Sequence, residues 1–141
     1  MESGMMINYI RQNVDMGISG LEKVIPHARS LNFRSALESQ LREYQQLSAS
    51  ADAMLNRMGG REVDAPAFSR VTAQIMTSVK SMTYGSDSEI AEDMIKGTTT
   101  GITKLSRHLT EYGERRDEVY DLSKRVISFE ENNIEEMKKY L

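Results

Sequence analysis

The sequence predicts an all-α protein, a four-helix bundle made of two repeated helical hairpins joined by a helical crossover. Three observations support this prediction. Apolar residues recur at three- and four-residue spacing along most of the chain, which is the period of an amphipathic helix. Only two prolines occur, and plentiful Leu, Met, Glu, Lys and Arg favour helix throughout. The third observation is an internal repeat, in which residues 6–25 match residues 90–109.

The repeat covers both helices of each predicted hairpin. In the first helices the offset is 84 residues, and Gly17 corresponds to Gly101. In the second helices the offset is 85 residues, and Tyr44 corresponds to Phe129. We therefore expect two similar hairpins that superpose and run parallel to each other. The predicted domain has three parts: a hairpin over residues 5–58, a crossover over residues 59–86 and a hairpin over residues 87–141.

The first hairpin is expected to contain helices of about 25 residues each. Its first helix spans residues 5–29, and Pro26 predicts a kink or an early end because it lacks a backbone donor. A short turn at residues 31–33 lets the second helix pack back antiparallel, as far as about Met58. The glycine pair 59–60 ends this helix, since glycine readily takes the left-handed conformation.

Residues 66–84 are expected to form the crossover helix, because Pro66 suits a first helical turn and Gly85 stops the pattern. Such a helix of roughly 19 residues is about 28 Å long at 1.5 Å per residue. That length carries the chain from one end of a small bundle to the other.

The second hairpin begins with a capping box formed by Ser86 and Glu89, in which each side chain bonds to the other residue's backbone amide. The helix that follows is expected to reach about Tyr112, with Gly113 after it. The last helix is expected from about Arg115 to the C-terminus.

Composition excludes several classes of function. The formal charge is −3, with 18 basic and 21 acidic residues interspersed, so nucleic acid is not an expected partner. The absence of cysteine excludes disulfides, thiol catalysis and thiolate metal sites. No apolar stretch approaches the roughly 20 residues of a membrane span, and the N-terminus lacks the regions of a signal peptide. We therefore expect a cytoplasmic protein without membrane contact.

Two segments resemble a known family. Residues 90–102 read IAEDMIKGTTTGI and residues 129–141 read FEENNIEEMKKYL. Both are similar to small uncharacterised bacterial proteins of the ferritin-like superfamily, and the resemblance covers almost the whole chain. It implies a ferritin-like four-helix bundle and brings no known activity with it.

The resemblance also implies positions where metal ligands would lie. Ferritin-like di-iron proteins place a carboxylate on the first helix of each hairpin and Glu-x-x-His on the second. Glu130 and Asn133 have this spacing, but asparagine replaces histidine. The repeat places Gln45 and Ser48 at the matching positions, and neither is a strong ligand. At the matching positions of the first helices, Val14 and Asp15 correspond to Thr98 and Thr99, and of these four only Asp15 carries a charge. No working di-metal centre is therefore expected.

The leading hypothesis is a non-catalytic structural or interaction protein that forms a homodimer, without catalytic residues or a cofactor and with an unknown protein partner. The alternative is a metal-binding or oxidative-stress protein with an oxygen-rich site around Asp15, Glu43 and Glu130. A spore-coat-like protein is a third possibility, suggested by fold analogy alone. The two histidines, His27 and His108, are not related by the repeat, and neither is assigned a metal or acid–base role.

Two further patterns each allow a structural and a functional interpretation. Asn133 lies on an otherwise apolar seam, where its amide needs a partner. A register-setting contact with Glu130 or Ser48 is favoured over a small polar pocket. Gly97 and Gly101 favour close helix approach inside the bundle over a contact between subunits.

Overall fold

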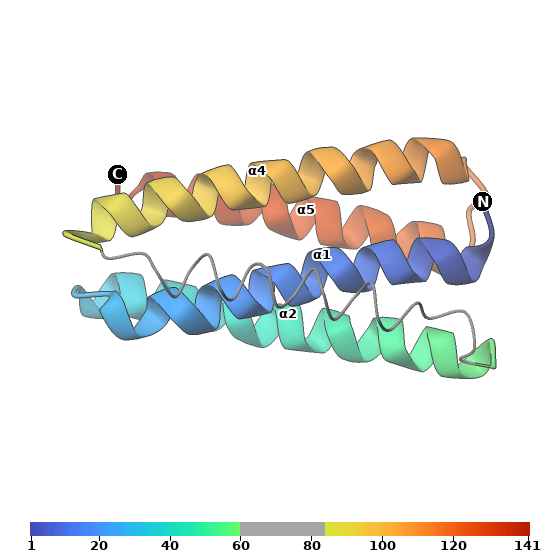
Figure 1. Ribbon diagram of the computed structural model, residues 1–141, viewed down its shortest axis with the longest axis horizontal. Helices are drawn as coiled ribbons and strands as arrows, with labels where there is room; N and C mark the ends of the chain where they lie inside the picture. Colours follow the sequence, from blue (N-terminus) through green and yellow to red (C-terminus); the bar gives the residue numbers. More distant parts are fainter. Residues whose placement is uncertain (60–83) are drawn as a thin grey trace.

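The computed structural model describes residues 1–59 and 84–141. These residues form four α-helices and one short 3-10 helix (Figure 1): α1 (Ser3–Val24), η1 (Ile25–His27), α2 (Leu31–Arg57), α4 (Asp87–Tyr112) and α5 (Glu118–Lys138). The described residues contain no strand, so the predicted all-α class is confirmed. The crossover helix predicted over residues 66–84 lies outside the described residues, apart from Tyr84.

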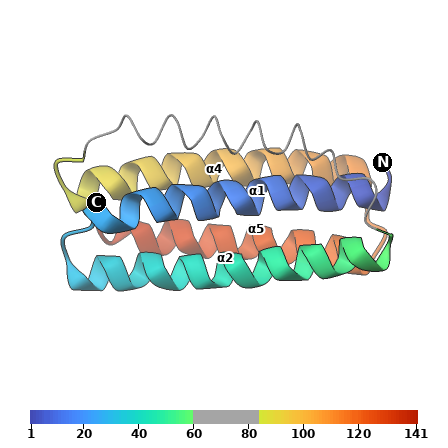
Figure 2. The ribbon, with the colours of Figure 1, turned by 60° about the horizontal axis from the view of Figure 1, so that its bottom comes forward.

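The helices pack as two antiparallel hairpins. Figure 2 shows α1 beside α4 in one layer and α2 beside α5 in the other. Tyr9 near the start of α1 stacks on His108 near the end of α4, with ring centroids 3.5 Å apart. Phe33 at the start of α2 likewise meets Tyr140 just beyond α5, at 4.6 Å. The two helices of each layer therefore run antiparallel.

The two hairpins were expected to run parallel to each other, and this is wrong because α4 is antiparallel to α1. The reason lies in where α2 ends and α4 begins, which are opposite ends of the bundle (Figure 1). The chain therefore has to return along the whole bundle before α4 begins. As a result α4 begins at the same end as α2 and runs in the same direction as α2. A long connection between the hairpins is still needed, but it makes α4 antiparallel to α1 instead of parallel.

The core is a continuous apolar interior shared by all four helices. Its largest fully buried side chains come from every helix, which is what amphipathic helices with a single core-facing stripe produce. They are Met6, Ile7, Ile10, Val14, Leu21, Val24, Phe33, Leu37, Leu47, Ile90, Leu105 and Met137. No described helix is long and apolar enough to cross a membrane.

In the first hairpin turn, the end of α1 agrees with the prediction at Pro26, but the start of α2 does not. Helix α1 ends at Val24, and the proline sits in η1, so the predicted early end is confirmed. The turn expected at residues 31–33 is wrong, because α2 already begins at Leu31. Ser30 caps it by accepting a hydrogen bond from the Phe33 amide at 3.2 Å. The sequence interpretation overlooked this capping serine.

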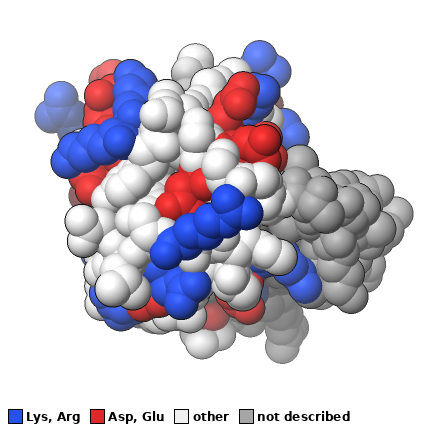
Figure 3. Space-filling model, turned by 90° about the vertical axis from the view of Figure 1, so that its left-hand side faces the viewer, with Lys and Arg blue, Asp and Glu red and all other residues white. Residues whose placement is uncertain are grey.

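The α4 start joins the two hairpins at one end of the bundle. Ser86 accepts from the Glu89 amide as predicted, at 3.2 Å, but the Glu89 carboxylate accepts from the Gly85 amide instead of the Ser86 amide. Asp87 accepts from the backbone amides of Arg29 at 2.8 Å and Ser30 at 2.9 Å. Figure 3 views this end and shows positive and negative side chains interspersed over its described part.

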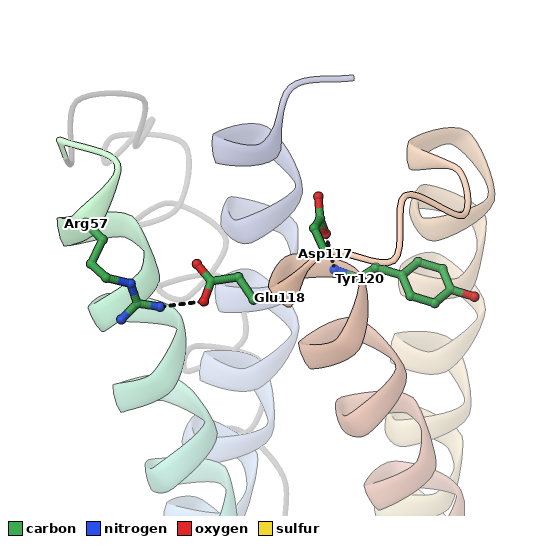
Figure 4. A network of polar contacts seen from close by, with 4 residues as sticks. All are labelled: Arg57, Asp117, Glu118 and Tyr120. Atoms are coloured by element: carbon green, nitrogen blue, oxygen red, sulfur yellow. Dashed lines mark hydrogen bonds and ion pairs between the residues drawn. The ribbon is translucent and has the colours of Figure 1, made fainter.

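Helix α5 begins three residues later than predicted, at Glu118 instead of Arg115. Asp117 caps it by accepting from the Tyr120 amide at 2.8 Å (Figure 4). Arg116 has a φ of 53° and Gly113 a φ of 88°, so the chain between α4 and α5 is not helical. Arg57 at the end of α2 and Glu118 at the start of α5 form an ion pair at 2.8 Å (Figure 4), and both side chains are exposed.

Candidate functional site

Polar side chains are buried within the bundle, and Glu130 with its neighbours Tyr44 and Asn13 forms what we call the Glu130 cluster. Each of the four helices contributes to the buried polar side chains, which are Asn13, Gln40, Thr98, Ser123, Glu130 and Asn133. Most buried polar groups in folded proteins have partners, so each exception needs an explanation. The most costly of these groups is Glu130, a carboxyl group that is only 2% exposed.

Glu130 is held by Tyr44 from the facing helix. The Tyr44 hydroxyl donates to Glu130 Oε2 at 2.7 Å. Burial raises the pKa of Glu130 to about 7, opposed by this hydrogen bond and by the nearby Asn13 amide. The pKa of Tyr44 is raised well above its ordinary value by burial and by the charge on Glu130, so the hydroxyl remains a neutral donor.

Within the described part of the chain, the second oxygen of this carboxyl group and the Asn13 amide lack well-formed hydrogen bonds. Glu130 Oε1 is buried and has no hydrogen-bond partner among the described residues. Neither amide atom of Asn13, a side chain that is 9% exposed, forms a hydrogen bond of normal geometry with a described residue, although the amide lies near enough to Glu130 to favour its ionised form. Unmade hydrogen bonds of buried groups each cost about 1–3 kcal/mol. The cluster therefore has unused capacity to accept and donate hydrogen bonds.

Two glycines bring the helices close enough to build the cluster. A Cβ on Gly17 would lie 2.5 Å from Tyr44 Cζ and 2.8 Å from each Cε atom, so the tyrosine ring lies directly against α1. A Cβ on Gly101 would lie 3.0 Å from Asn13 Nδ2 and 3.6 Å from Glu130 Oε2. The Tyr44 ring is also held edge-on by Phe129, at 4.8 Å. The close approach predicted for Gly101 is thus observed, whereas that predicted for Gly97 is wrong, because no described atom lies within 4 Å of a Cβ built there.

A cavity of about 320 Å³ adjoins the cluster. Its described lining combines four glycines, three apolar side chains and six side chains with a polar group: Asn13, Met16, Gly17, Gly20, Val24, Tyr44, Tyr84, Asp93, Met94, Gly97, Thr98, Gly101 and Glu130. Ligand pockets in proteins have volumes of about 300–1,000 Å³ and are mostly apolar with a few placed polar groups. This cavity fits that description at its lower limit.

The three candidate metal ligands lie in different places. Glu130 is in the bundle centre, whereas Glu43 lies at the surface and pairs with Arg125 at 3.4 Å. Asp15 is half-buried between α1 and α2, where Ser48 donates to its Oδ1 at 3.5 Å. Burial and the neighbouring Asp52 raise the pKa of Asp15. The described residues contain no cluster of three or more His, Asp or Glu side chains that could hold a metal ion.

Comparison with known families places the chain. A family described as a domain of unknown function, DUF2383, matches residues 5–111. The chain belongs to the DUF2383 family. No curated protein and no solved structure matches the chain. The DUF2383 match contains Asn13 and Tyr44 and stops before α5, which carries Glu130.

Asn133 is buried in this DUF2383 protein, but not with the partners predicted for it. Ser48 bonds to Asp15 on α1, and Asn133 Nδ2 has no hydrogen-bond partner among the described residues. Its amide lies close enough to Tyr44 to favour the ionised phenol slightly, against the dominant effect of burial. The expected register contact with Ser48 is therefore wrong. Instead, the Asn133 amide lies near Tyr44 at the edge of the Glu130 cluster, without a well-formed hydrogen bond from its Nδ2.

Replacing Asn133 with leucine is expected to be neutral or to stabilise the fold by up to about 1 kcal/mol. Leucine removes a buried donor that has no partner, and an apolar group of similar shape can replace such a donor at little cost. Chemical unfolding of Asn133→Leu measures the effect. Asn132→Leu, at an exposed position one residue earlier on α5, is the control and should change stability very little. A loss of roughly 3 kcal/mol in Asn133→Leu alone would mean that the amide is essential to the cluster.

Asn13 and Tyr44 are the site residues that the sequence interpretation missed as functional groups. Asn13 lies three residues after Ile10 and four before Gly17, both on the apolar face. That spacing was a usable signal, since helix positions three and four apart share a face. The match of Tyr44 with Phe129 in the repeat favours a core position for the Tyr44 ring, but nothing in one helix indicates that its hydroxyl meets Glu130.

Proposed function

We propose that this DUF2383 protein is a ferritin-like bundle that binds a small molecule and does not catalyse a reaction. In place of a di-metal centre it holds one buried carboxyl group and a tyrosine. The topology supports the ferritin-like assignment, because α2 and α4 run in the same direction, as in four-helix bundles with one long crossover connection. The observation that carries the proposal is the hydrogen bond between Tyr44 and Glu130 beside a largely apolar cavity.

The donor set at the centre favours binding over metal chemistry. Iron, manganese and zinc sites need several strong ligands at short distance. Around Glu130 the neighbouring groups are the hydroxyl of Tyr44 and the amides of Asn13 and Asn133, all neutral. The other two candidates, Asp15 and Glu43, already interact with groups elsewhere in the bundle. This separation argues against the metal-binding or oxidative-stress alternative.

Catalysis is disfavoured by what surrounds the carboxyl group. Acid–base chemistry on a substrate usually combines a tuned acid or base with a nucleophile or a second proton carrier. Glu130 in the cavity lining has a pKa near neutrality. The pKa of Tyr44, however, is raised well above its ordinary value, which makes Tyr44 a poor proton carrier near neutral pH. One buried carboxyl group beside a largely apolar cavity suits the recognition of a ligand.

Metal analysis tests the proposal directly. Protein purified without a His tag and loaded with ferrous iron or manganese is expected to retain far less than one metal per chain after gel filtration, as measured by mass spectrometry of the elements. Glu130→Gln should retain the same amount. Stoichiometric metal that disappears in Glu130→Gln would contradict the proposal and restore the metal-binding alternative.

The homodimer and the cytoplasmic location expected from the sequence remain part of this proposal. Neither depends on the cavity. Light scattering of the purified protein checks the first, and fractionation of cells checks the second.

A further inference from the structure

The cavity beside Glu130 has a polar end and an apolar body. Glu130 and Asn13 form the polar end, and both side chains are at least nine-tenths buried. Glu130 Oε1 and the Asn13 amide atoms have no hydrogen-bond partner among the described residues. Leaving such atoms unbonded is costly, so a ligand that bonds to them gains affinity from groups that are already desolvated.

The apolar body of the cavity lies between α1 and α4. Gly17 and Gly20 from α1 face Gly97 and Gly101 from α4 across it. No described atom lies within 4 Å of a Cβ built on Gly97, so glycine at this position leaves open space. Tyr44 and Asn13 fill the space beside Gly17 and Gly101, whereas a Cβ on Gly20 would meet only the end of the Met94 side chain, at 3.9 Å. A ligand can therefore lie against the helix backbones at Gly20 and Gly97.

The volume of the cavity and its flexible methionine side chains determine which ligands fit. Its volume of about 320 Å³ is roughly twice that of the ~150 Å³ apolar cavity that accommodates benzene in another protein. One ring with a short chain therefore fits. Met16 and Met94 line the walls, and methionine adapts its shape to different apolar groups.

The charged side chains of the described lining are all acidic. Glu130 and Asp93 are the acidic side chains of the described lining, which contains no Lys, Arg or His. A carboxylate in a pocket of low polarity strongly prefers a cationic hydrogen-bond donor. An anionic ligand would meet repulsion from both carboxyl groups.

We propose that the cavity binds a small primary amine with an apolar body. The ammonium group donates to Glu130 Oε1 and Asn13 Oδ1 after these side chains turn toward the cavity, because both oxygens are fully buried in the structure. The apolar body lies between Gly20 of α1 and Gly97 of α4. This inference rests on the proposed function, since it names the ligand class of the same site.

The test uses the full chain and three probes of nearly equal shape. These are 2-phenylethylamine, 2-phenylethanol and phenylacetate, which present a cation, a neutral hydroxyl and an anion. Titration calorimetry is carried out at pH 8, where the amine is protonated and Glu130 is largely ionised. The groups that face Glu130 from the other helices are Tyr44, Asn13 and Gly101, and none of them changes charge near this pH.

The amine is expected to bind at least tenfold more tightly than the alcohol, and phenylacetate should not bind measurably. Glu130→Gln should weaken amine binding at least tenfold and leave the alcohol unchanged. Glu131→Gln, at the exposed neighbouring position on α5, is the matched control and should bind the amine like the unaltered protein. Gly97→Leu, which adds bulk to the open side of the cavity, should weaken both the amine and the alcohol.

Other outcomes overturn the inference in different ways. Equal binding of amine and alcohol would show an apolar site without recognition of the charge. Absence of all binding, in protein that contains no metal, would refute the amine inference and leave the non-metal proposal standing. Stoichiometric metal would refute the proposed function itself. Consumption of the amine, followed by mass spectrometry, would refute the non-catalytic assignment while supporting the recognition of amines.

Discussion

Replacing Gly17 with alanine is expected to destabilise the bundle by about 3 kcal/mol. The added methyl group would lie 2.5 Å from Tyr44 Cζ, which is far inside contact distance, so the ring has to move. Overpacking of a core costs about 1–3 kcal/mol. Displacing the ring also breaks the hydrogen bond to Glu130 and leaves a buried carboxyl group without its donor. These losses outweigh the roughly 1 kcal/mol by which alanine favours a helix over glycine.

Gly97→Ala is the matched control on the opposite helix. Gly97 is exposed, and no described atom lies within 4 Å of a Cβ at this position. Alanine should therefore stabilise α4 by up to about 1 kcal/mol through helix propensity alone. Urea unfolding of both variants measures the two effects. If Gly17→Ala is as stable as Gly97→Ala, the tyrosine ring does not lie against α1 and the description of the site is wrong.

The sequence predicted helices well where a single residue dominates the local backbone. Pro26 ends α1 because it lacks a donor, and Gly59 ends α2 with a φ of 93°. Ser86 caps α4 as its spacing with Glu89 indicated. Boundaries set by competing signals were predicted less well. Ser30 and Asp117 cap α2 and α5, whereas the predicted starts lay after the turn at residues 31–33 and at about Arg115.

The arrangement of the hairpins required information that periodicity does not contain. Each helix shows which of its faces is buried, but that pattern is the same for a parallel and an antiparallel neighbour. Contacts such as Tyr9 with His108 decide the direction, and they join residues about a hundred positions apart. The crossover length was a useful clue, but its consequence for direction was inferred incorrectly.

The site was predictable only in part, for a related reason. Helical spacing placed Glu130 and Asn133 on the buried seam, and both are buried. It did not predict that Tyr44 would bond to Glu130, or that Ser48 would turn to Asp15. Which polar atoms meet depends on helix rotation of a few degrees and on close approach at Gly17 and other positions, and neither can be obtained from one sequence.

The stability of the bundle is expected to fall as pH rises from about 4.5 to above 7, and Glu130 is the cause. The pKa of Glu130 is about 7 in the folded chain, above its ordinary value of 4.5. Between these values the folded protein binds more protons than the unfolded chain, so unfolding becomes easier as pH increases. A rise of this size corresponds to at most about 3 kcal/mol for a group that is almost completely buried. The contribution is fully present below pH 4.5 and is lost as pH passes through 7.

Glu130→Gln should remove this dependence, because glutamine keeps the shape and still accepts from Tyr44 but carries no charge. At pH 8 the variant is expected to be more stable than the unaltered protein by up to about 3 kcal/mol, and near pH 4.5 the two should be similar. The measurement is urea unfolding of both proteins from pH 4.5 to pH 8. Asp15, whose pKa is also raised, is present in both proteins, so its contribution cancels in the difference. Glu131→Gln, an exposed neighbour, should follow the unaltered protein at every pH. A difference between Glu130→Gln and the unaltered protein that stays constant with pH would mean that Glu130 titrates in contact with water, and the desolvated site described here would not exist.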